Sequence, residues 1–349
     1  MKKLLFLFVF TCISNLIFAA DDMKSEYVLP PAKFGVAHGS SIVSLPNNEL
    51  LSCYFAGKKE AGMDIKILCS RKENGKWSNP KIAVNRQEFS HWSILPNKTV
   101  GNTVLHLDRE NRLWLFYVSN FIGGWAMAQV SYKVSTNFGK SWTRGRKLTR
   151  IISKLIRTKI IELENGNFIL PLYHEFYKKQ AMTCVLKPKG KRIVKKWCKR
   201  VPGNEHIQPA IVKDKSKDIY HVYMRNMKRG QTLYTSFSSK NVKSPKFSKV
   251  IELDIPNPNS SIDVIDFEKE GALAVFNNHP KERTPLSIGF TTNYKDFKIL
   301  YDLETGIEDY SYPYIIKGKD NRYHLTYTDG ENKTIKYVNF SIDWVRKHQ

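Results

Sequence analysis

A repeat of roughly fifty residues constrains the fold of this 349-residue chain more than any other feature of its sequence. In each copy a polar turn precedes an apolar and aromatic run of strand length, as in ENRLWLFYVSN (residues 110–120) and DNRYHLTYTD (residues 320–329). The matching turn positions are Asn48, Asn111, Gly166, Asp218, Gly271 and Asn321, which lie 63, 55, 52, 53 and 50 residues apart. Six copies of one period indicate a repeat architecture.

Each copy provides strands and little helical periodicity. A second strand signal precedes each turn, as in NTVLHLD (residues 102–108) and TKIIELE (residues 158–164). Four strands of about 5–6 residues with short turns fit in one repeat. The sequence therefore predicts an all-β fold, a six-bladed β-propeller with four antiparallel strands per blade, formed by residues 21–349 as one domain. Two stacked β-sandwiches are the competing arrangement, but they do not explain six equal periods.

The first twenty residues have the layout of a secretory signal peptide. Lys2 and Lys3 precede a broken apolar run, and the small residues Ala19 and Ala20 end it. An uncleaved membrane anchor is the alternative, although the apolar stretch is short for a membrane span. No later segment is long and apolar enough to cross a bilayer. We therefore expect an exported protein, periplasmic or secreted, with no transmembrane segment in the mature chain.

Four cysteines follow the predicted signal peptide: Cys53, Cys69, Cys184 and Cys198. An even number in an exported chain suggests disulfides, and four cysteines allow three pairings. The close pairs would join neighbouring strands, and each closed loop of about 15 residues would contribute roughly 3 kcal/mol. Four buried free thiols are the alternative. The cysteine spacing is not that of a zinc site, and no motif requires a metal ion or an organic cofactor.

The chain is strongly basic, with 56 Lys and Arg against 32 Asp and Glu. Loss of the signal peptide would leave a net charge of +22, with a dense patch at residues 187–200. The excess is either a generally basic surface or a means of attracting anionic polymers such as acidic glycans, lipopolysaccharide or nucleic acid. Because no zinc-finger spacing or RNA-binding signature is present, we do not expect a nucleic-acid partner.

The stretch VSTNFGKSWT (residues 134–143) ends a polar turn on a large apolar residue, Trp142. Ser and Asn side chains in such a turn bond to their own backbone. We expect the indole to wedge between neighbouring sheets, which is a structural role. Degenerate copies are SRKENGKW (residues 70–77) and TTNYKDF (residues 291–297), in phase with the fifty-residue repeat.

The innermost strands of a propeller begin around a central mouth, where ligand sites gather. The predicted strand starts are polar or aromatic: HGSS (38–41), VGNT (100–103), IRTK (156–159), HIQP (206–209), NPNSS (257–261) and YSYP (310–313). Six polar clusters that converge on one point favour a ligand site at this mouth.

These turns, the six repeats and the strings GSSIV, IQPAIV, NPNSSIDV and SYPYII resemble bacterial sialidase-like proteins of the Asp-box, or BNR repeat, class. The likeness covers most of residues 27–340. In typical sialidases three arginines bind the substrate carboxylate, an aspartic acid donates a proton, and a tyrosine aided by a glutamate is the nucleophile. Guanidinium groups match a planar anion well, and a phenol nucleophile avoids repulsion beside that anion.

The resemblance implies a role for four residues. Arg225 and Arg283 fall where the second and third arginines are expected, Tyr310 resembles the nucleophile, and Asp64 lies in the loop of the proton donor. Two positions depart from the pattern. His38 stands in place of the first arginine, and Gln208 stands where the glutamate would fall. An amide cannot accept the proton of the tyrosine, so Glu175 is a candidate replacement base.

We predict that substrate-binding residues surround this chemistry: His38, His206, Gln208, Arg225, Asn257, Asn259, Asp263, Arg283, Glu308 and Tyr312. Each has a structural alternative. The arginines could pair with Glu308 or Asp263, the tyrosines could pack at the rim, the histidines could make ordinary hydrogen bonds, and the asparagines and aspartates could cap turns.

The leading hypothesis is an exported sialidase-like glycoside hydrolase that binds a carbohydrate, with an anionic glycan as the main candidate. One alternative is a glycan-binding propeller with a degenerate active site, which His38 and Gln208 favour. The other is elimination chemistry on uronic-acid polysaccharides. The sequence does not fix the substrate sugar, the linkage or the oligomeric state.

Overall fold

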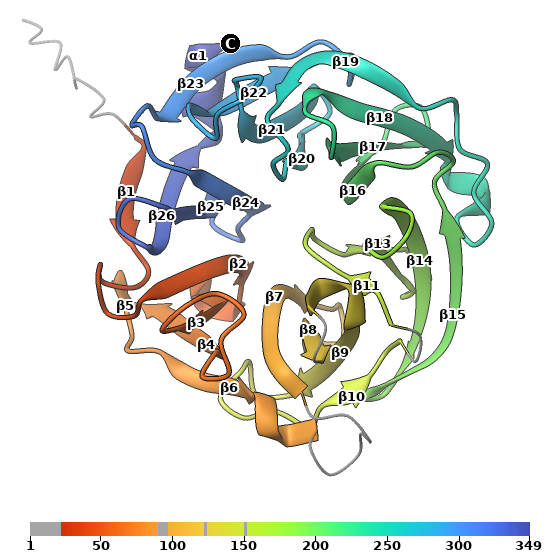
Figure 1. Ribbon diagram of the computed structural model, residues 1–349. Coiled ribbons are helices and arrows are strands. Elements are labelled where there is room, and N and C mark those ends of the chain that lie inside the picture. Colours follow the sequence, from red (N-terminus) through yellow and green to blue (C-terminus); the bar gives the residue numbers. More distant parts are fainter. Residues whose placement is uncertain (1–21, 90–96, 122–123, 150–151) are drawn as a thin grey trace, which may run out of the picture.

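The computed structural model describes residues 22–89, 97–121, 124–149 and 152–349. The predicted signal peptide lies outside these residues. Strands dominate, and the α-helix of the described chain is the short α1 (Ile342–His348) at its end. Short 3-10 helices occur at η1 (Pro46–Asn48), η2 (Arg86–Phe89), η3 (Gly124–Met127) and η4 (Ser239–Asn241). Figure 1 shows the sheets arranged as a ring.

The strands form five hydrogen-bonded sheets. The first contains β2 (Val36–Ser44), β3 (Leu50–Gly57), β4 (Lys66–Glu73), β5 (Lys76–Trp77) and β6 (Lys81–Asn85). The second contains β7 (Asn97–Leu107), β8 (Leu113–Phe121), β9 (Ala128–Ser135) and β10 (Arg146–Lys147). A later sheet contains β20 (Asp263–Phe267), β21 (Gly271–Asn277), β22 (Leu286–Thr291) and β23 (Lys298–Glu304).

The largest sheet has nine strands. Its first part contains β11 (Lys154–Leu155), β12 (Ile161–Glu162), β13 (Phe168–His174), β14 (Gln180–Lys189) and β15 (Arg192–Arg200). Its second part contains β16 (His206–Asp214), β17 (Ile219–Asn226), β18 (Gly230–Ser238) and β19 (Ile251–Asn257). One parallel pair, Gln180 with His206, joins the two parts. All the other strand pairs of this sheet are antiparallel.

The last sheet combines the two ends of the described chain. It contains β24 (Tyr310–Lys317), β25 (Arg322–Asp329) and β26 (Thr334–Ser341), and the N-terminal strand β1 (Lys24–Tyr27) pairs with β26. This pairing brings residues about 300 positions apart into one sheet, as Arg322 and Asp22 show with an ion pair of 2.7 Å. Figure 1 shows β1 beside β26.

The core lies between neighbouring sheets. Strand β8 (LWLFYVSNF) is buried along its whole length, because adjacent sheets cover both of its faces. Trp114 on β8 meets Phe168 on β13 edge to face, with ring centroids 5.6 Å apart. Apolar side chains on both faces of a strand therefore hold the ring together, which explains the long unbroken hydrophobic runs in the sequence.

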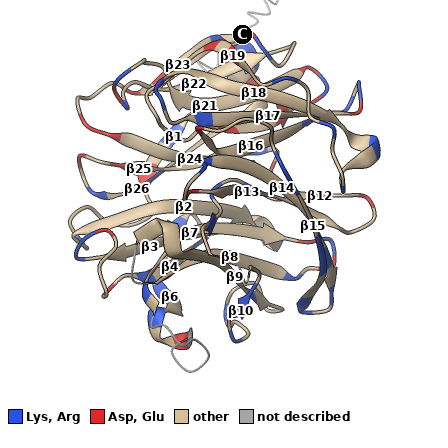
Figure 2. Ribbon diagram, turned by 45° about the vertical axis from the view of Figure 1, so that its right-hand side comes forward, with Lys and Arg blue, Asp and Glu red and all other residues tan. Residues whose placement is uncertain are grey.

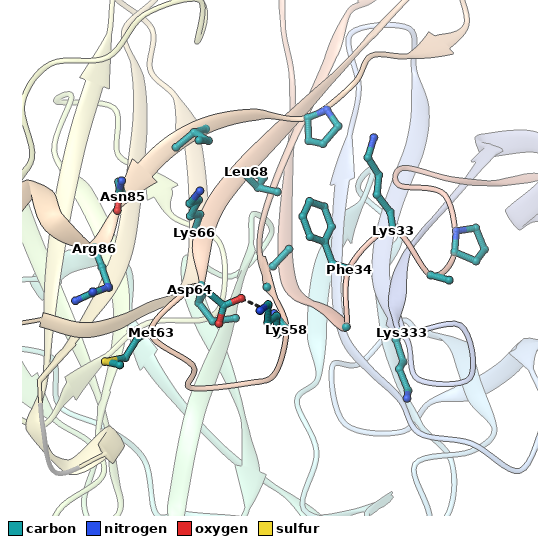
Figure 3. Close-up of a pocket in the computed structure, with 18 of the residues that line it drawn as sticks. Lys33, Phe34, Lys58, Met63, Asp64, Lys66, Leu68, Asn85, Arg86 and Lys333 are labelled. Carbon is teal, nitrogen blue, oxygen red and sulfur yellow. Dashed lines mark hydrogen bonds between the residues drawn. The ribbon is translucent and has the colours of Figure 1, made fainter.

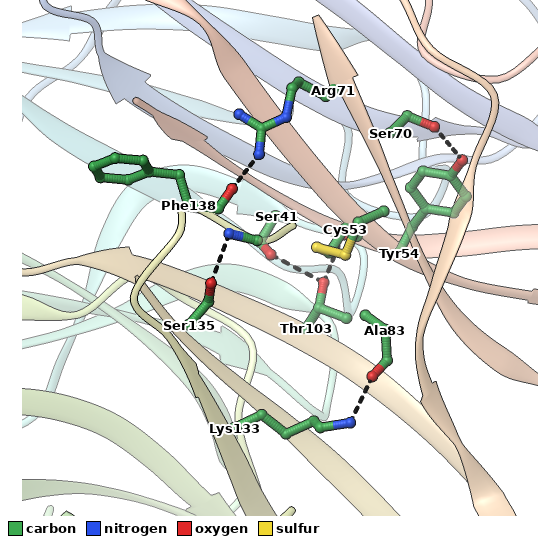
Figure 4. The surroundings of a disulfide bond; sticks show 12 residues. Ser41, Cys53, Tyr54, Ser70, Arg71, Ala83, Thr103, Lys133, Ser135 and Phe138 are labelled. Atoms are coloured by element: carbon green, nitrogen blue, oxygen red, sulfur yellow. Dashed lines mark hydrogen bonds between the residues drawn. A yellow bond between two sulfur atoms is a disulfide. The ribbon is translucent and has the colours of Figure 1, made fainter. Parts of the chain in front are cut away.

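Both expected cysteine pairs are bonded in the structure, Cys53 with Cys69 and Cys184 with Cys198. Each disulfide joins directly opposite residues of two antiparallel strands. Figure 4 shows that contacts between the first two sheets surround the first disulfide. Thr103 on β7 donates to the carbonyl of Cys53 at 2.7 Å, and Lys133 on β9 donates to the carbonyl of Ala83 at 2.9 Å.

The turn at residues 134–143 is held by its own side chains. The Ser135 hydroxyl accepts from the amide of Gly139 at 2.8 Å, and the Asn137 side chain accepts from the amide of Ser141 at 2.9 Å. Trp142 packs against a core cluster formed by Leu51 and other residues of the first two sheets. The indole therefore lies where a wedge between sheets was expected. Residues 291–297 repeat the pattern, with Thr291 accepting from the amide of Tyr294 at 2.9 Å.

Candidate functional site

Several strands that face the centre of the ring are irregular near their starts. The pairing register shifts between His38 and Ser41 on β2, and between Ile207 and Ala210 on β16. Shifts at the same place occur on β7 and β24. At these points the backbone adopts positive φ at Gly39, Asn102, Gln208 and Tyr312, and Asn259, in the segment before β20, does so too. β-bulges commonly re-aim a side chain at a functional site.

Positive φ is costly for residues with a Cβ, on the order of 1–3 kcal/mol each, and persists where the surrounding structure enforces it. Three of the strained residues, Asn102, Gln208 and Tyr312, line the same small cavity. The irregular backbone thus directs side chains from separate sheets toward a common point.

This cavity has a volume of about 160 Å³. It is smaller than the range of about 300–1,000 Å³ that holds drug-sized ligands, so it suits a single small ring. Its lining comes from four of the five sheets and their loops: His38, Glu60, Asn102, Trp125, Leu155, Tyr173, Glu175, Gln208, Arg225 and Tyr312. We call it the central cavity.

Arg225, on β17, is the principal cation of the central cavity. Its Nε donates to the side-chain oxygen of Asn259 at 2.6 Å, and its Nη1 donates to that of Gln208 at 3.3 Å. Both partners are neutral amides, so they orient the guanidinium without neutralising it. A ligand carboxylate that reached Arg225 would gain a charge-assisted hydrogen bond.

The Tyr173 hydroxyl lies at the end of this network. It accepts from the amide nitrogens of Asn102 at 3.3 Å and Gln208 at 3.4 Å. Burial, and then the nearby Glu175, raise the pKa of Tyr173 well above its ordinary value. The phenol therefore keeps its proton, which remains available to donate to Glu175 or to a ligand.

Two further arginines border the site. Arg157 is fully buried, and it donates to the carbonyls of Ser40 at 2.9 Å and Pro313 at 3.2 Å, which ties the bulge of β2 to that of β24. Arg283 donates to the carbonyl of Asn259 at 3.1 Å and approaches Asp309 at 3.7 Å.

The positive charges of these arginines act on the pKa of His38. Burial, and then the charges of Arg157, Arg283 and Arg225, lower its pKa to about 3. Its ring meets that of Tyr312 edge to face, with centroids 4.5 Å apart. The imidazole is therefore neutral at physiological pH, and the positive charge of the site comes from the arginines.

Two carboxyl groups, those of Glu60 and Glu175, lie within the positive field of the arginines. Burial raises the pKa of Glu60, and Arg283 opposes the rise. Burial also raises the pKa of Glu175, which Arg225 and Lys179 oppose. Carboxyl groups with raised pKa values suit the exchange of protons with a substrate.

The structure brings together many of the predicted site residues. His38, Glu175, Gln208, Arg225 and Tyr312 line the central cavity. Asn259 and Arg283 adjoin it, since Asn259 bonds to both Arg225 and Arg283.

The two residues expected to carry the chemistry lie elsewhere. The Asp64 carboxylate accepts from the backbone amide of Lys58 at 2.7 Å and borders a separate groove. The Tyr310 hydroxyl donates to Glu331 at 3.3 Å, and its ring packs in a core cluster. Burial, and then the nearby acidic residues, raise the pKa of Tyr310 to about 12, so this phenol is poorly suited to act as a nucleophile.

Three of the four other predicted binding residues have structural contacts. His206 accepts from the amide of Ala181 at 3.1 Å. Asn257 bonds to the backbone of Ser260, which caps a turn. Asp263 is buried, pairs with Lys159 at 2.6 Å and accepts from the amide of Ile315 at 2.8 Å. Glu308 is exposed.

Sequence reasoning missed Glu60, Tyr173 and Arg157. Glu60 lies in the same loop as Asp64, and the choice between two acids four residues apart depends on how the loop turns. Tyr173 and Glu175 are two residues apart at the end of one strand, so strand alternation places both side chains on one face. The spacing in the sequence therefore predicts that Tyr173 lies on the same face as Glu175. Arg157 lies in the quoted string IRTK at an expected strand start.

Among the residues that the structure describes, no group of three or more His, Cys, Asp or Glu side chains is placed to hold a metal ion. No helix in that part of the chain has the length and apolarity needed to span a bilayer.

Comparison with known proteins identifies the family. The family of BNR repeat-like domains matches residues 48–325, which is most of the chain. The chain belongs to the BNR repeat-like domain family. This finding confirms the resemblance drawn from the turns and the repeat. The BNR repeat-like chain has no match in sequence among curated proteins.

Solved structures show the same fold. The BNR repeat-like chain matches a Hadza microbial sialidase with a TM-score of 0.71 and 14% identity, over 88% of this chain and 66% of that one. It matches the NanB sialidase of Streptococcus pneumoniae with a TM-score of 0.71 and 11% identity, over 91% of this chain and 71% of that one.

A Dyadobacter fermentans protein of unknown function matches with a TM-score of 0.73 and 12% identity, over 92% of this chain and 99% of that one. The BNR repeat-like chain therefore has an all-β fold that matches sialidases, which are β-propellers. It spans less than two thirds of the length of the Hadza sialidase.

Proposed function

We propose that this chain is an exported glycoside hydrolase that cleaves an acidic sugar from a glycan in the central cavity. One observation supports this proposal above all. Glu60 and Glu175, two carboxyls whose pKa values are raised, border the same cavity as Arg225, whose guanidinium has only amide partners among the residues that the structure describes. The arginine suits an anionic sugar, and the two carboxyls suit acid and base catalysis at its glycosidic bond.

We also propose that the ring of sheets consists of six blades. The nine-stranded sheet would comprise two blades, since a single parallel residue pair joins its halves. The turns at residues 134–143 and 291–297 would be Asp-boxes, each with a Ser or Thr hydroxyl that accepts from the backbone of its own turn. Export fits the predicted signal peptide and the two disulfides, because disulfides persist in oxidising compartments.

Glu60 is the general acid in this mechanism, and it replaces Asp64 of the same loop. Its carboxyl gives a proton to the glycosidic oxygen as the bond to the anomeric carbon breaks. Glu175 accepts a proton from the water molecule that attacks that carbon. The products are the free acidic sugar and the released alcohol, and proton exchange with solvent restores both carboxyls.

The remaining side chains orient the sugar. Arg225, assisted by Arg283 at the edge, binds the sugar carboxylate, and the Tyr173 hydroxyl donates to the ring substituents. Tyr312, held by its strained backbone against His38, provides an aromatic wall. Gln208 positions Arg225 and takes no part in proton transfer.

A glycan-binding protein without turnover is the second candidate. Gln208 supports it, because an amide bonded to Arg225 and Tyr173 stands where the catalytic glutamate of a sialidase would be expected.

The test is the release of sugar from sialylated, uronic-acid and neutral glycans. The wild type should release an acidic sugar, and Glu60→Gln and Glu175→Gln should each reduce kcat by at least about 100-fold. Asp64→Asn should change kcat by less than about tenfold and is the matched control. Binding without turnover by the wild type would select the second candidate, and a new absorbance from an unsaturated product would indicate elimination.

A further inference from the structure

A second and larger hollow opens beside the central cavity. It has a volume of about 1270 Å³ and lies between the first sheet and the sheet that holds both ends of the chain. Its lining includes Phe34, Met63, Lys66, Arg86 and Lys333. We call it the basic groove, and Figure 3 shows its side chains.

Strand pairing places the groove and the central cavity at the same end of the sheets. On the first sheet Val36 pairs with Gly57, Ala56 pairs with Lys66, and Lys66 pairs with Asn85. These paired residues form a row that crosses the first sheet from its inner strand β2 to its outer strand β6. The row begins at Val36, two residues before His38, which lines the central cavity. The groove therefore extends from the mouth of the cavity toward the rim of the ring.

One loop forms a wall of both hollows. Residues 58–65 join β3 to β4. Glu60 of this loop lines the central cavity, whereas Met63 and Asp64 line the basic groove. A linear ligand that leaves the central cavity past Glu60 would cross this loop and reach the groove.

The charge of the groove is positive and largely uncompensated. Five basic residues line it, Lys33, Lys58, Lys66, Arg86 and Lys333, against the two acids Asp64 and Glu331. With the residues that the structure describes, the ammonium groups of Lys58, Lys66 and Lys333 form no hydrogen bond or ion pair.

Neither acid neutralises these lysines. The Asp64 carboxylate accepts from the backbone amide of Lys58, and Glu331 accepts from the Tyr310 hydroxyl. Three unpaired ammonium groups along one groove attract an anion, and they do so with a marked dependence on salt.

The groove also offers apolar surface. Figure 3 shows the ring of Phe34 and the side chain of Leu68 among the lysines. Met63 and Ile82, which line the same groove, are 63% and 58% exposed. Spaced cations above apolar patches suit a chain of sugar rings, each of which has an apolar face and carries an anionic group.

We propose that the basic groove binds the further rings of a linear acidic oligosaccharide whose terminal ring occupies the central cavity. The proposal rests on the proposed function, since it extends the site of that function. Lys58, Lys66 and Lys333 contact carboxylate or sulfate groups of successive rings, and Phe34 and Met63 contact their apolar faces. The small central cavity then selects one terminal sugar, and the groove selects a long anionic chain.

The test measures binding by titration calorimetry with Glu175→Gln protein, in which turnover does not interfere. The probes are galacturonate, its trimer and hexamer, a sulfated chondroitin hexasaccharide, and neutral maltohexaose. An acidic hexamer should bind at least about tenfold more tightly than the monomer. Changing Lys58, Lys66 and Lys333 together to Gln should remove this advantage and leave the Kd of galacturonate unchanged. The two acidic hexamers distinguish carboxylate from sulfate.

The matched control changes Lys191, Lys195 and Lys199, at and near β15, to Gln, which removes the same charge from a different sheet. This variant should bind the hexamers as the parent protein does. Equal losses in both triple variants, an unaltered hexamer Kd in the groove variant, or equally tight binding of maltohexaose would overturn the groove proposal. A DNA oligonucleotide bound as tightly as the acidic hexamers, with the same loss in the groove variant, would overturn its specificity for sugars. Failure to hydrolyse any glycan would instead count against the proposed function alone.

Discussion

At the scale of single residues, the site depends on charges that are held in place without being neutralised. Amides hold Arg225, and backbone carbonyls hold Arg157. The amide partners orient the guanidinium of Arg225 and leave its charge available to a ligand, whereas a carboxylate partner would cancel it. The neutral Gln208 beside Arg225 therefore makes the cavity more attractive to anions than a carboxylate at this position would.

Replacing Gln208 with Glu should weaken the binding of an acidic sugar by about tenfold or more, because the new carboxylate would pair with Arg225. The Kd of galacturonate, measured by calorimetry at pH 7, checks this expectation. Gln231→Glu, at the start of β18, adds the same charge elsewhere and should leave the Kd unchanged. Tighter binding by the Gln208→Glu variant would contradict the role given to Arg225.

His38 should make the folded protein sensitive to acid. Its folded pKa of about 3 lies below the ordinary value of 6.5, so between these pH values the unfolded chain binds a proton that the folded chain does not. The free energy of unfolding must then decrease as pH falls below 6.5, by up to about 1.4 kcal/mol per pH unit for one proton.

His38→Gln should flatten this dependence by one proton between pH 6.5 and pH 4.5, as measured by urea unfolding at several pH values. Asn278→Gln, at a partly exposed side chain that does not titrate, is the control and should leave the slope as it is in the wild type. An unchanged slope for His38→Gln would mean that the imidazole is not held neutral.

At the scale of elements, the bulged inner strands and the turns whose side chains bond to their own backbone have different roles. The bulges aim side chains at the cavity, and the turns fix sheets to one another. Gly139 illustrates the second role, because its φ is +85° and a Cβ there would lie 2.9 Å from Leu51. The glycine lets the turn approach the neighbouring sheet closely enough for Trp142 to pack.

Gly139→Ala should therefore destabilise the protein by more than Gly75→Ala. Gly75 also has positive φ, +78°, but a Cβ there would meet no atom within 4 Å. Backbone strain alone should lower the free energy of unfolding by about 1 kcal/mol in each variant, and the clash should add roughly another 1–3 kcal/mol at Gly139. Chemical denaturation measures the difference, and equal losses would show that the turn does not pack closely.

The sequence predicted elements better than the positions of side chains. The repeat of apolar runs located the strands because burial on both faces leaves a strong pattern. The site depends on features without such a pattern. Glu60 and Asp64 lie in one loop, and its path sends Glu60 to the cavity and Asp64 to the groove. Tyr310 and Tyr312 both lie near the start of β24, and Tyr312, within the bulge between Ser311 and Tyr314, is the one that lines the cavity.

At the scale of the whole molecule, a ring of sheets brings together residues that are far apart in the sequence. The central cavity joins His38 near the start of the described chain to Tyr312 near its end. Pairing of β1 with β26 holds the two ends of the described chain in one sheet. The excess of basic residues is spread around the ring, as Figure 2 shows, including along β15. Its field would draw anionic glycans toward the molecule from any side.

The central claim is that an acidic sugar binds where the inner strands converge. The most direct measurement is a crystal structure of the Glu175→Gln variant grown with an acidic trisaccharide. We predict density for one ring in the central cavity, with its carboxylate on Arg225 and its glycosidic oxygen beside Glu60. An empty central cavity at a saturating ligand concentration, or a sugar bound only elsewhere on the ring, would contradict the account.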